Sequence, residues 1–414
     1  MNPQKKYEQL ITEYIKNQKS KILREPDGKL KHKFIVPGAC YSHQLWDWDS
    51  WFTDIAISNT LETDEEKLYF SEYQKGCILN FLENMYENGS IPFMTSGEET
   101  FCESEGGDSN GAKPVIIQHA LFVCKFNHDF SWLRSEYQKL KKFLAFYENN
   151  CKHESGLYFF IDDWAIGVDN DPCTFYRPKR SSGSIYLNCL MYKELLAMSE
   201  IAANLNEEGD ARLYSDMANA LKSAIREHCY DERNGFYYSV DLNLLPITND
   251  HWIHLGCPRH WNTLIQKIDV WSGFLAMWAG IATEEQADRM VKENYLMPHI
   301  FYSEYGIRTL SKSEKMYLIK ESNNPSCWLG PIWGISNYLT FRALVKYGYK
   351  DLAKDLAQRT VGLFGKDLSE CGEFHEYYDP ETGKGISNQG FQSWNLLVSN
   401  MISYLNGEPY TEEQ

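Results

Sequence analysis

The sequence predicts an all-α protein whose helices form an (α/α)6 toroid, which is a ring of six helical hairpins. Three observations predict this fold: twelve segments of the 414-residue chain have helical periodicity, most of these segments form close pairs, and the long loops precede the first helix of a pair. No linker or low-complexity stretch divides the chain, so we expect a single domain over residues 1–414.

The expected helices follow one another with short connections in between. They cover residues 3–19, 49–60, 65–87, 114–126, 130–149, 184–204, 208–229, 270–280, 283–294, 331–347, 349–365 and 389–405. The ten helices from 49–60 to 349–365 form five antiparallel hairpins in chain order. The helices 3–19 and 389–405 remain at the two ends, and we expect them to pack together and close the ring.

The long loops of this arrangement all lie at the same end of the hairpins, so we expect them to gather on one face. They cover residues 31–48, 90–113, 151–183, 230–269, 295–330 and 366–388. Loops of this length within a compact fold are usually functional or disordered, and the aromatic residues, glycines and prolines of these loops favour function. The stretches Leu157–Ile161 and Phe236–Val240 follow glycines and have β-like sequences, which predicts small hairpins at one mouth of the ring.

The composition excludes several classes of partner. A formal net charge of −16 argues against binding to a nucleic-acid backbone or to an anionic membrane, and no apolar run is long enough to span a bilayer. The 11 cysteines are scattered and odd in number, which favours reduced thiols in the cytoplasm. The residues after Met1 contain no apolar stretch typical of a signal peptide, so a cytoplasmic location is expected.

Two acidic clusters about two hundred residues apart indicate the chemistry. Residues 162–172 and 374–383 each combine carboxylates with aromatic residues and turn formers at helix boundaries. Two carboxylates from distant segments favour cleavage of a glycosidic bond, in which one group protonates the leaving oxygen and the other activates water or attacks carbon. The 12 Trp, 27 Tyr and 21 Phe residues suit the flat faces of sugars, although an aromatic core would have the same composition.

Four motifs in order resemble those of trehalases and of glycoside hydrolase family 63. They lie within residues 36–52, 167–172, 328–339 and 376–394, and Leu329 replaces the arginine that is usual in the third motif. The chain is closer in size to the bacterial hydrolases of mannosylglycerate and glucosylglycerate than to the eukaryotic processing glucosidases, which have an additional β-domain. The resemblance implies an inverting, exo-acting α-glycosidase on an (α/α)6 barrel, with Asp169 as general acid and Glu376 as general base.

The residues themselves are compatible with these roles but leave alternatives. A general acid must keep its proton near pH 7, and Asp169 has the neighbouring carboxylates and the nearby Trp164 that would raise its pKa. The alternative for residues 169–172 is an Asx-type turn. Glu376 is flanked by aromatic residues, and Glu373 and Glu381 are its rivals. For inversion we expect the two carboxyl groups roughly 6.5–9.5 Å apart.

Further residues are expected to bind the sugar. Asp49 can accept two hydroxyl hydrogen bonds, unless it only caps a helix, and Gln118 either reaches a subsite or caps local backbone. Arg308 either binds an acidic aglycone or forms an ordinary salt bridge. The expected substrate-binding residues are Trp46, Asp49, Trp51, Gln118, Trp164, Asn170, Trp328, Gly330, Trp333 and Trp394.

No cofactor and no metal is expected. His251, His254, Cys257 and His260 crowd one loop, but their spacing matches no standard zinc pattern. We therefore expect a small saccharide, such as a short α-glucoside, as the partner. Three rivals remain: a sugar epimerase or an unsaturated-uronyl hydrolase on the same toroid, and a carbohydrate-binding protein without catalysis. The epimerase would use histidines such as His43, His119 and His375.

Overall fold

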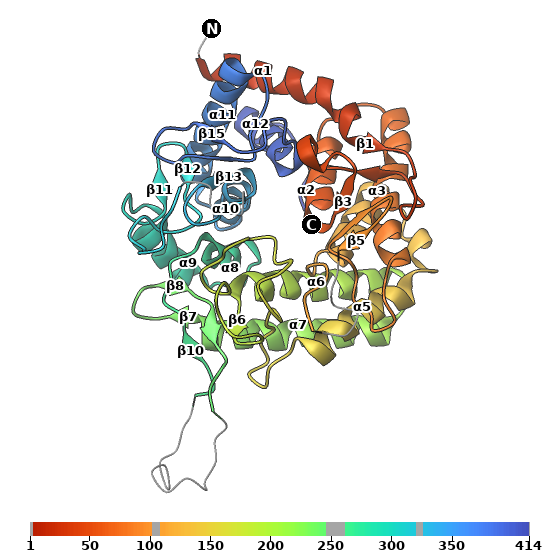
Figure 1. Ribbon diagram of the computed structural model, residues 1–414, viewed down its shortest axis with the longest axis vertical. Helices are drawn as coiled ribbons and strands as arrows, with labels where there is room; N and C mark the ends of the chain where they lie inside the picture. The colour runs from red at the N-terminus through yellow and green to blue at the C-terminus, as the bar shows by residue number, and fades with distance from the viewer. Residues whose placement is uncertain (1–2, 102–107, 246–260, 320–325, 414) are drawn as a thin grey trace, which may run out of the picture.

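The computed structural model describes residues 3–101, 108–245, 261–319 and 326–413 (Figure 1). The histidines and the cysteine of the 251–260 loop lie outside the described residues. The helices of the described residues are α1 Pro3–Gln18, α2 Asp47–Ser58, α3 Asp64–Glu83, α4 Ile116–Phe126, α5 Tyr137–Asn150, α6 Ile185–Asn204, α7 Glu208–Cys229, α8 Leu275–Trp278, α9 Glu284–Met290, α10 Gly334–Lys346, α11 Lys350–Cys371 and α12 Val398–Asn406. In the described residues, no helix is both long enough and apolar enough to cross a membrane.

Every expected helical segment contains a helix, but some segments are shorter or change type. The segment 130–149 begins as the 3₁₀ helix Ser131–Leu133, where Asp129 accepts a hydrogen bond from Ser131 N at 2.9 Å, and it becomes α helix only at Tyr137. The segment 270–280 begins as the 3₁₀ helix Trp271–Phe274. The segment 283–294 ends as the π-helix Val291–Tyr295, and 389–405 begins as the 3₁₀ helix Ser393–Leu397.

Two kinds of helix alternate along the chain, and burial explains why. Every residue of α2 is buried, and α4, α6 and α10 are buried over most of their surface. By contrast, α7 buries one stripe, with Tyr214, Ala218, Leu221 and Ile225 three or four residues apart. A helix that is apolar on all sides requires neighbours on all sides, whereas an amphipathic helix covers a surface. The chain therefore builds an inner layer and an outer layer of helices.

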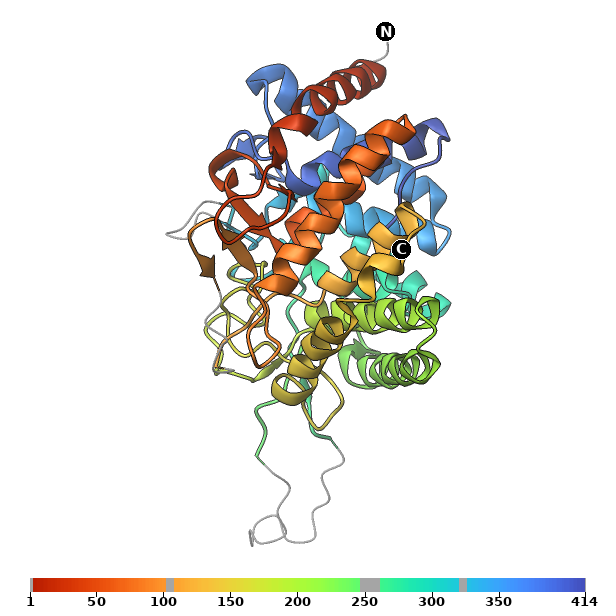
Figure 2. The same ribbon diagram turned by 90° about the vertical axis from the view of Figure 1, so that its right-hand side faces the viewer.

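The inner helices follow one another around a ring (Figures 1 and 2). In order, α2, α4, α6, α8 and α10 each pack against the next, α10 packs against the 3₁₀ helix Ser393–Leu397, and that helix packs against α2. Outer helices such as α3, α7 and α11 lie against the inner ones, and α1 packs mainly against α11 and also touches α12. This helix-rich arrangement is consistent with an (α/α)6-type fold.

Small antiparallel sheets of two or three strands lie between the helices. The strands are β1 Leu23–Arg24, β2 Phe34–Ile35, β3 Gln44–Trp46, β4 Met94–Ser96, β5 Thr100–Phe101, β6 Ser182–Gly183, β7 Tyr230–Asp231, β8 Phe236–Tyr237, β9 Val240–Asp241, β10 Leu264–Ile265, β11 Tyr302–Ser303, β12 Gly306–Ile307, β13 Ile332–Trp333, β14 Tyr377–Tyr378 and β15 Gly385–Ile386. The expected stretch Phe236–Val240 is thus divided between β8 and β9, which belong to different sheets.

The stretch Leu157–Ile161 is not a named strand, but it forms a minimal hairpin. Tyr158 makes an antiparallel bridge to Lys152, and backbone hydrogen bonds of 2.8 Å flank this bridge on both sides. The side chain of Asn188, from α6, bonds the N–H and the carbonyl of Tyr158 over 2.8 Å each. Because this amide satisfies the N–H and the carbonyl of Tyr158, no further strand pairs with the stretch at this residue.

Two of the sheets position residues at the N-terminal ends of inner helices. Strand β3 leads directly into α2 and pairs with β4, and β13 leads directly into α10 and pairs with β14. Trp46 and Trp333 are the residues that precede the two helices. Loop residues from both ends of the chain are therefore held beside the same face of the ring.

Candidate active site

A cavity of about 520 Å³ opens among the loops on this face. Its lining residues come from segments 37–49, 93–113, 163–175 and 326–394, so most of the expected long loops contribute. The described part of loop 230–269 contributes no lining residue. The volume lies within the range of roughly 300–1,000 Å³ that is usual for sites of small molecules.

Asp169 lies on the cavity wall in a loop that turns sharply. Gly167 and Asn170, on either side of it, have positive φ angles of 78° and 53°. Asn170 Oδ1 accepts a hydrogen bond from the backbone N of Trp328 at 3.0 Å, which ties this loop to the loop before α10. Asn110 donates to the carbonyl of Asp162 at 2.9 Å. The segment is therefore both a braced turn and part of the cavity wall.

The other carboxylates of this cluster have different surroundings. Asp162 pairs with Lys179 at 3.3 Å, and it does not line the cavity. Asp171 is buried away from the cavity, where its carboxylate accepts a hydrogen bond from Cys173 N at 3.1 Å and burial raises its pKa to about 6. Asp163 lines the cavity and is exposed.

Glu376 lines the cavity just before β14, and only 5% of the residue is exposed. Burial raises its pKa to about 8, and the charges of Asp49 and Asp169 add to the rise. The side chains of Asn388 and Tyr41 oppose it. The three carboxylates of Glu376, Asp49 and Asp169 line the same cavity.

The rivals of Glu376 are occupied elsewhere. Glu381 pairs with Arg308 at 2.7 Å and with Lys312 at 2.9 Å, and neither Glu381 nor Glu373 lines the cavity. Arg308 also donates to the carbonyl of Pro298 at 3.1 Å. It therefore joins two loops by a salt bridge, which is the second of the two roles considered for it, and it does not line the cavity.

Asp49 lies at the base of the cavity and is buried. Ser393 Oγ donates a hydrogen bond to Asp49 Oδ1 at 2.7 Å. Burial raises the pKa of Asp49 to about 7, while Ser393 and the charge of Lys113 oppose the rise. Lys113 also lines the cavity, and its Nζ lies 2.7 Å from Asp47 Oδ1 with both side chains buried. The cavity thus combines a cation with several carboxylates.

Aromatic rings form much of the remaining wall. Trp46 lies 5.6 Å from Tyr41 and 5.6 Å from Phe93, measured between ring centroids. Trp48 lies 4.9 Å from Trp394. The aromatic lining residues are Tyr41, Trp46, Trp48, Phe93, Phe101, Trp164, Phe175, Trp333, Phe391 and Trp394. Flat apolar surface of this kind suits the faces of sugar rings.

Four of the expected substrate-binding residues do not line the cavity. Trp51 is fully buried against Phe52, and Gln118 donates to the carbonyls of Pro114 and Leu190. Trp328 stacks behind Trp333 with centroids 4.1 Å apart. A Cβ atom on Gly330 would lie 2.5 Å from the Tyr317 ring, so Gly330 permits close packing in the loop. The other six, Trp46, Asp49, Trp164, Asn170, Trp333 and Trp394, line it.

The polar residues at this site that were not predicted from the sequence include Lys113, Tyr41 and Ser393. Tyr41 stands within the first family-like motif, and its aromatic neighbours were a usable signal. Lys113 precedes Pro114 at the start of α4, and a lone lysine there gives no indication of its buried partner. Ser393 acts on Asp49 across 344 positions of the chain, which no local pattern reveals.

Comparisons of the sequence with known proteins agree with this geometry. A family model described as the mannosylglycerate hydrolase MGH1-like glycoside hydrolase domain matches residues 41–394. Mannosylglycerate hydrolase MGH1 of Selaginella moellendorffii is 29% identical over 91% of this chain and 83% of its own length. The cytosolic neutral trehalase of Kluyveromyces lactis is 24% identical over 90% of this chain and 56% of its own length, so the chain spans about half of that protein.

Comparison of the structure gives a similar result for the fold. The family 63 mannosylglycerate hydrolase from Thermus thermophilus, solved in complex with glucose, has a TM-score of 0.68 and 19% identity, covering 95% of this chain and 100% of its own. Neutral trehalase from Saccharomyces cerevisiae has a TM-score of 0.62 and 15% identity, covering 95% of this chain and 79% of its own. The resemblance read from the four motifs is confirmed, and the chain belongs to the mannosylglycerate hydrolase MGH1-like family of glycoside hydrolases.

Proposed function

We propose that this glycoside hydrolase is an inverting, exo-acting α-glycosidase that cleaves a small α-glucoside in the cytoplasm. Asp169 is the general acid and Glu376 is the general base, on a single (α/α)6 toroidal domain. The observation that carries the proposal is the convergence of Asp169, Glu376 and Asp49 on one cavity with aromatic walls. A cavity of about 520 Å³ suits a short saccharide rather than a polymer chain.

In the proposed reaction, the proton of Asp169 moves to the glycosidic oxygen as the bond to the anomeric carbon breaks. Glu376 removes a proton from a water molecule, and the water oxygen attacks that carbon from the opposite face. Both carboxylates stabilise the positive charge that develops on the sugar ring. Asp49 binds sugar hydroxyl groups at the base of the cavity, because a carboxylate accepts two hydrogen bonds from neighbouring hydroxyls.

Glu376 must be ionised to act as a base. Burial and two neighbouring carboxylates raise its pKa to about 8, so most of the population holds a proton there at pH 7 and the base form dominates only above about pH 8. The side chains of Asn388 and Tyr41 oppose this rise and favour the anion. A catalytic pKa near the working pH is the usual compromise between protonation state and proton affinity.

The decisive experiment is proton NMR of the first sugar anomer released from a panel of α-linked glucosides, mannosides and galactosides. Mannosylglycerate and trehalose belong in the panel, because relatives are named for hydrolases of these compounds. We expect the β-anomer to appear first. If the α-anomer appears first, the reaction is retaining and the roles of Asp169 and Glu376 are wrong.

Substrates with different leaving groups distinguish the acid role of Asp169 from the base role of Glu376. A 2,4-dinitrophenyl α-glycoside of the sugar found in the panel has a leaving group that needs no protonation. Asp169→Asn should lose about 10²–10⁴-fold of activity on the natural linkage and far less on the dinitrophenyl glycoside. Glu376→Gln should lose activity on both substrates. Equal losses for Asp169→Asn on the two substrates would remove the acid role from Asp169.

The histidine-based alternative has no support at this cavity. Of the three histidines considered, His43 is exposed, His119 pairs with Asp54 at 2.9 Å inside the core, and His375 pairs with Asp367 at 3.0 Å. None of the three lines the cavity. An epimerase that depends on paired histidines would need them there.

A further inference from the structure

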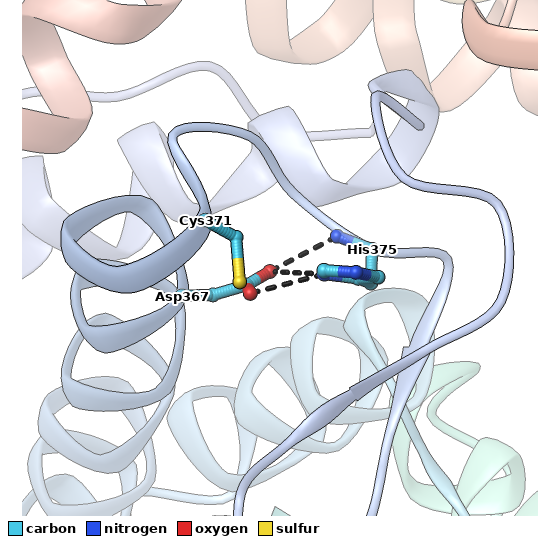
Figure 3. Close-up of side chains that lie close together, drawn as sticks. All are labelled: Asp367, Cys371 and His375. Carbon is cyan, nitrogen blue, oxygen red and sulfur yellow. Dashed lines mark hydrogen bonds and ion pairs between the residues drawn. The ribbon is translucent and has the colours of Figure 1, made fainter.

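Three side chains of metal-binding type lie close together at the C-terminal end of α11 and in the loop that follows it (Figure 3). Asp367 and Cys371 are one turn apart on α11, His375 follows in the loop, and their ligand atoms all lie within 4.8 Å of one another. A carboxylate, a thiol and an imidazole resemble a partial zinc site. The hydrogen bonds of Asp367, however, explain the arrangement without an ion.

The buried carboxylate of Asp367 already has three protein donors. Its Oδ2 accepts hydrogen bonds from the backbone N of His375 at 3.0 Å and from the hydroxyl of Tyr378 at 2.8 Å. His375 Nδ1 lies 3.0 Å from both carboxylate oxygens, which requires a proton on Nδ1. An acceptor-only group that faces three donors is a satisfied structural anchor.

The residues that donate these hydrogen bonds lie on either side of Glu376 in the sequence. His375 precedes it directly, and Tyr378 follows it by two positions, so one carboxylate on α11 fixes both sides of Glu376. On the far side of His375, Asn395 Nδ2 donates to the carbonyl of His375 at 2.8 Å. Gly385 of strand β15 lies over the imidazole, where a Cβ atom would collide with Nδ1.

We propose that Asp367 is a positioning residue for the general base: through His375 and Tyr378 it sets where the Glu376 carboxylate stands in the cavity. The inference rests on the proposed role of Glu376 and extends it to a residue that does not line the cavity. A carboxylate is required, because an asparagine would turn an NH₂ group towards one or more of the three donors.

The test is Asp367→Asn. We expect kcat to fall by about 10- to 100-fold with KM within about threefold, because a displacement near 1 Å of a reacting group can cost about 10²-fold in rate. Tyr378→Phe removes one of the three donors and should lower kcat less. Asp355→Asn is the matched control on the same helix, where Asp355 pairs with Arg359 at 2.8 Å, and it should leave kcat unchanged.

Cys371→Ser tests the metal interpretation. Because Asp367 has its three donors without the thiol, this variant and treatment with a chelator should leave kcat unchanged. Loss of activity in both, with recovery on addition of Zn²⁺, would overturn the positioning role in favour of a metal site. A fall of kcat that merely tracks a loss of folded protein in Asp367→Asn would also overturn it, so the circular dichroism and the Tm of each variant are measured first.

A crystal structure of Asp367→Asn separates this inference from the proposed function. We expect the Glu376 carboxylate to move or to lose its single position, while Asp169 and Asp49 stay in place. If Glu376 keeps its position, the positioning role is wrong whatever the activity. If Glu376 moves but Glu376→Gln retains full activity, the positioning is right and the proposed role of Glu376 is wrong.

Discussion

Ser393 Oγ donates a hydrogen bond to Asp49 Oδ1 over 2.7 Å, so a residue near the end of the chain influences the protonation of a carboxylate near its beginning. Burial raises the pKa of Asp49 to about 7, and Ser393 and Lys113 hold it from rising further. Because the anion accepts hydrogen bonds from sugar hydroxyls more strongly than the protonated carboxyl group, the affinity of the cavity should depend on pH around neutrality.

Ser393→Ala should raise the pKa of Asp49 further, because the lost hydrogen bond favours the anion. A bond worth about 1 kcal/mol corresponds to about 0.7 pKa units, so KM at pH 7 should rise about threefold. The increase should vanish well above pH 7, where Asp49 is ionised in both proteins. The measurement is KM against pH, and Ser399→Ala, whose hydroxyl donates to the carbonyl of Ala56, is the control. An increase of equal size at every pH would contradict the electrostatic explanation.

Asn388→Ala should move the pH profile in the alkaline direction. The Asn388 side chain lowers the pKa of Glu376, so its removal should raise the pKa above about 8. As a base acts only when ionised, the ascending limb of kcat/KM against pH should shift to higher pH by roughly 0.5–1 unit. Gln389→Ala, which alters the neighbouring exposed residue, should leave the limb in place. A limb that stays still or moves to lower pH in Asn388→Ala would count against Glu376 as the base.

The helices could be predicted from the sequence because inner and outer helices differ in their local amino-acid composition. Residues Ile116–Cys124 of α4 are all buried and α7 buries one stripe, and both patterns are visible in the distribution of apolar residues. The hairpin expected at Leu157–Ile161 is reduced to one antiparallel bridge for a tertiary reason, since the Asn188 side chain bonds the N–H and the carbonyl of Tyr158. A contact 30 positions away cannot be read from a local pattern.

Site residues that lie within one sequence motif could be predicted. Site residues whose role depends on a contact with a distant part of the chain were missed. Asp169, Glu376 and Asp49 carry recognisable neighbours, and all three line the cavity. Trp51 and Gln118 stand near these motifs but face the core, because a motif does not say which side of a helix faces the ligand. Lys113 was missed because its partner Asp47 is 66 positions away.

Lys113→Met should destabilise the fold because it leaves the charge of Asp47 buried without its cation. The Nζ of Lys113 lies 2.7 Å from Asp47 Oδ1, and both side chains are almost fully buried. Breaking such a pair by removing one partner typically costs about 3–5 kcal/mol. The double variant Lys113→Met/Asp47→Asn should recover much of the loss, since no uncompensated charge remains. Urea unfolding of the two single variants and the double variant measures the coupling energy.

Lys152→Met is the control for that cycle, because Lys152 forms an exposed ion pair with Glu148 at 2.9 Å. Surface pairs are worth about 0–1 kcal/mol, so its unfolding free energy should change little. If Lys113→Met costs no more than this control, the buried pair does not stabilise the base of the cavity, and Lys113 is then retained for its effect on Asp49 and the ligand.

Glu413 is a second buried charged residue, and it contacts the inner helices away from the cavity. Its carboxylate accepts hydrogen bonds from Trp278 Nε1 of α8 at 2.8 Å and from Arg342 Nε of α10 at 2.9 Å. Trp278 is the last residue of α8 and Arg342 lies in the C-terminal half of α10, whereas the cavity is lined by residues at helix N-terminal ends such as Asp49 and Trp333. One buried carboxylate therefore joins two inner helices away from the site.

Glu413→Gln should lower the free energy of unfolding at pH 7 by about 3 kcal/mol, because it leaves the buried Arg342 without its buried anionic partner. Burial acts to raise the pKa of Glu413, but the charges of Arg342 and Lys193 outweigh it and hold the pKa below its ordinary value. A depressed carboxyl pKa stabilises the folded state above the unfolded value, and this contribution is lost as pH falls through the folded value. The difference in free energy of unfolding between the wild type and Glu413→Gln should therefore become smaller at acid pH.

Glu412→Gln is the control, because it alters an exposed partner of Arg342 and should lower the free energy of unfolding much less. If the difference between the wild type and Glu413→Gln stays constant down to acid pH, the Glu413 side chain stabilises the fold by packing and not by charge.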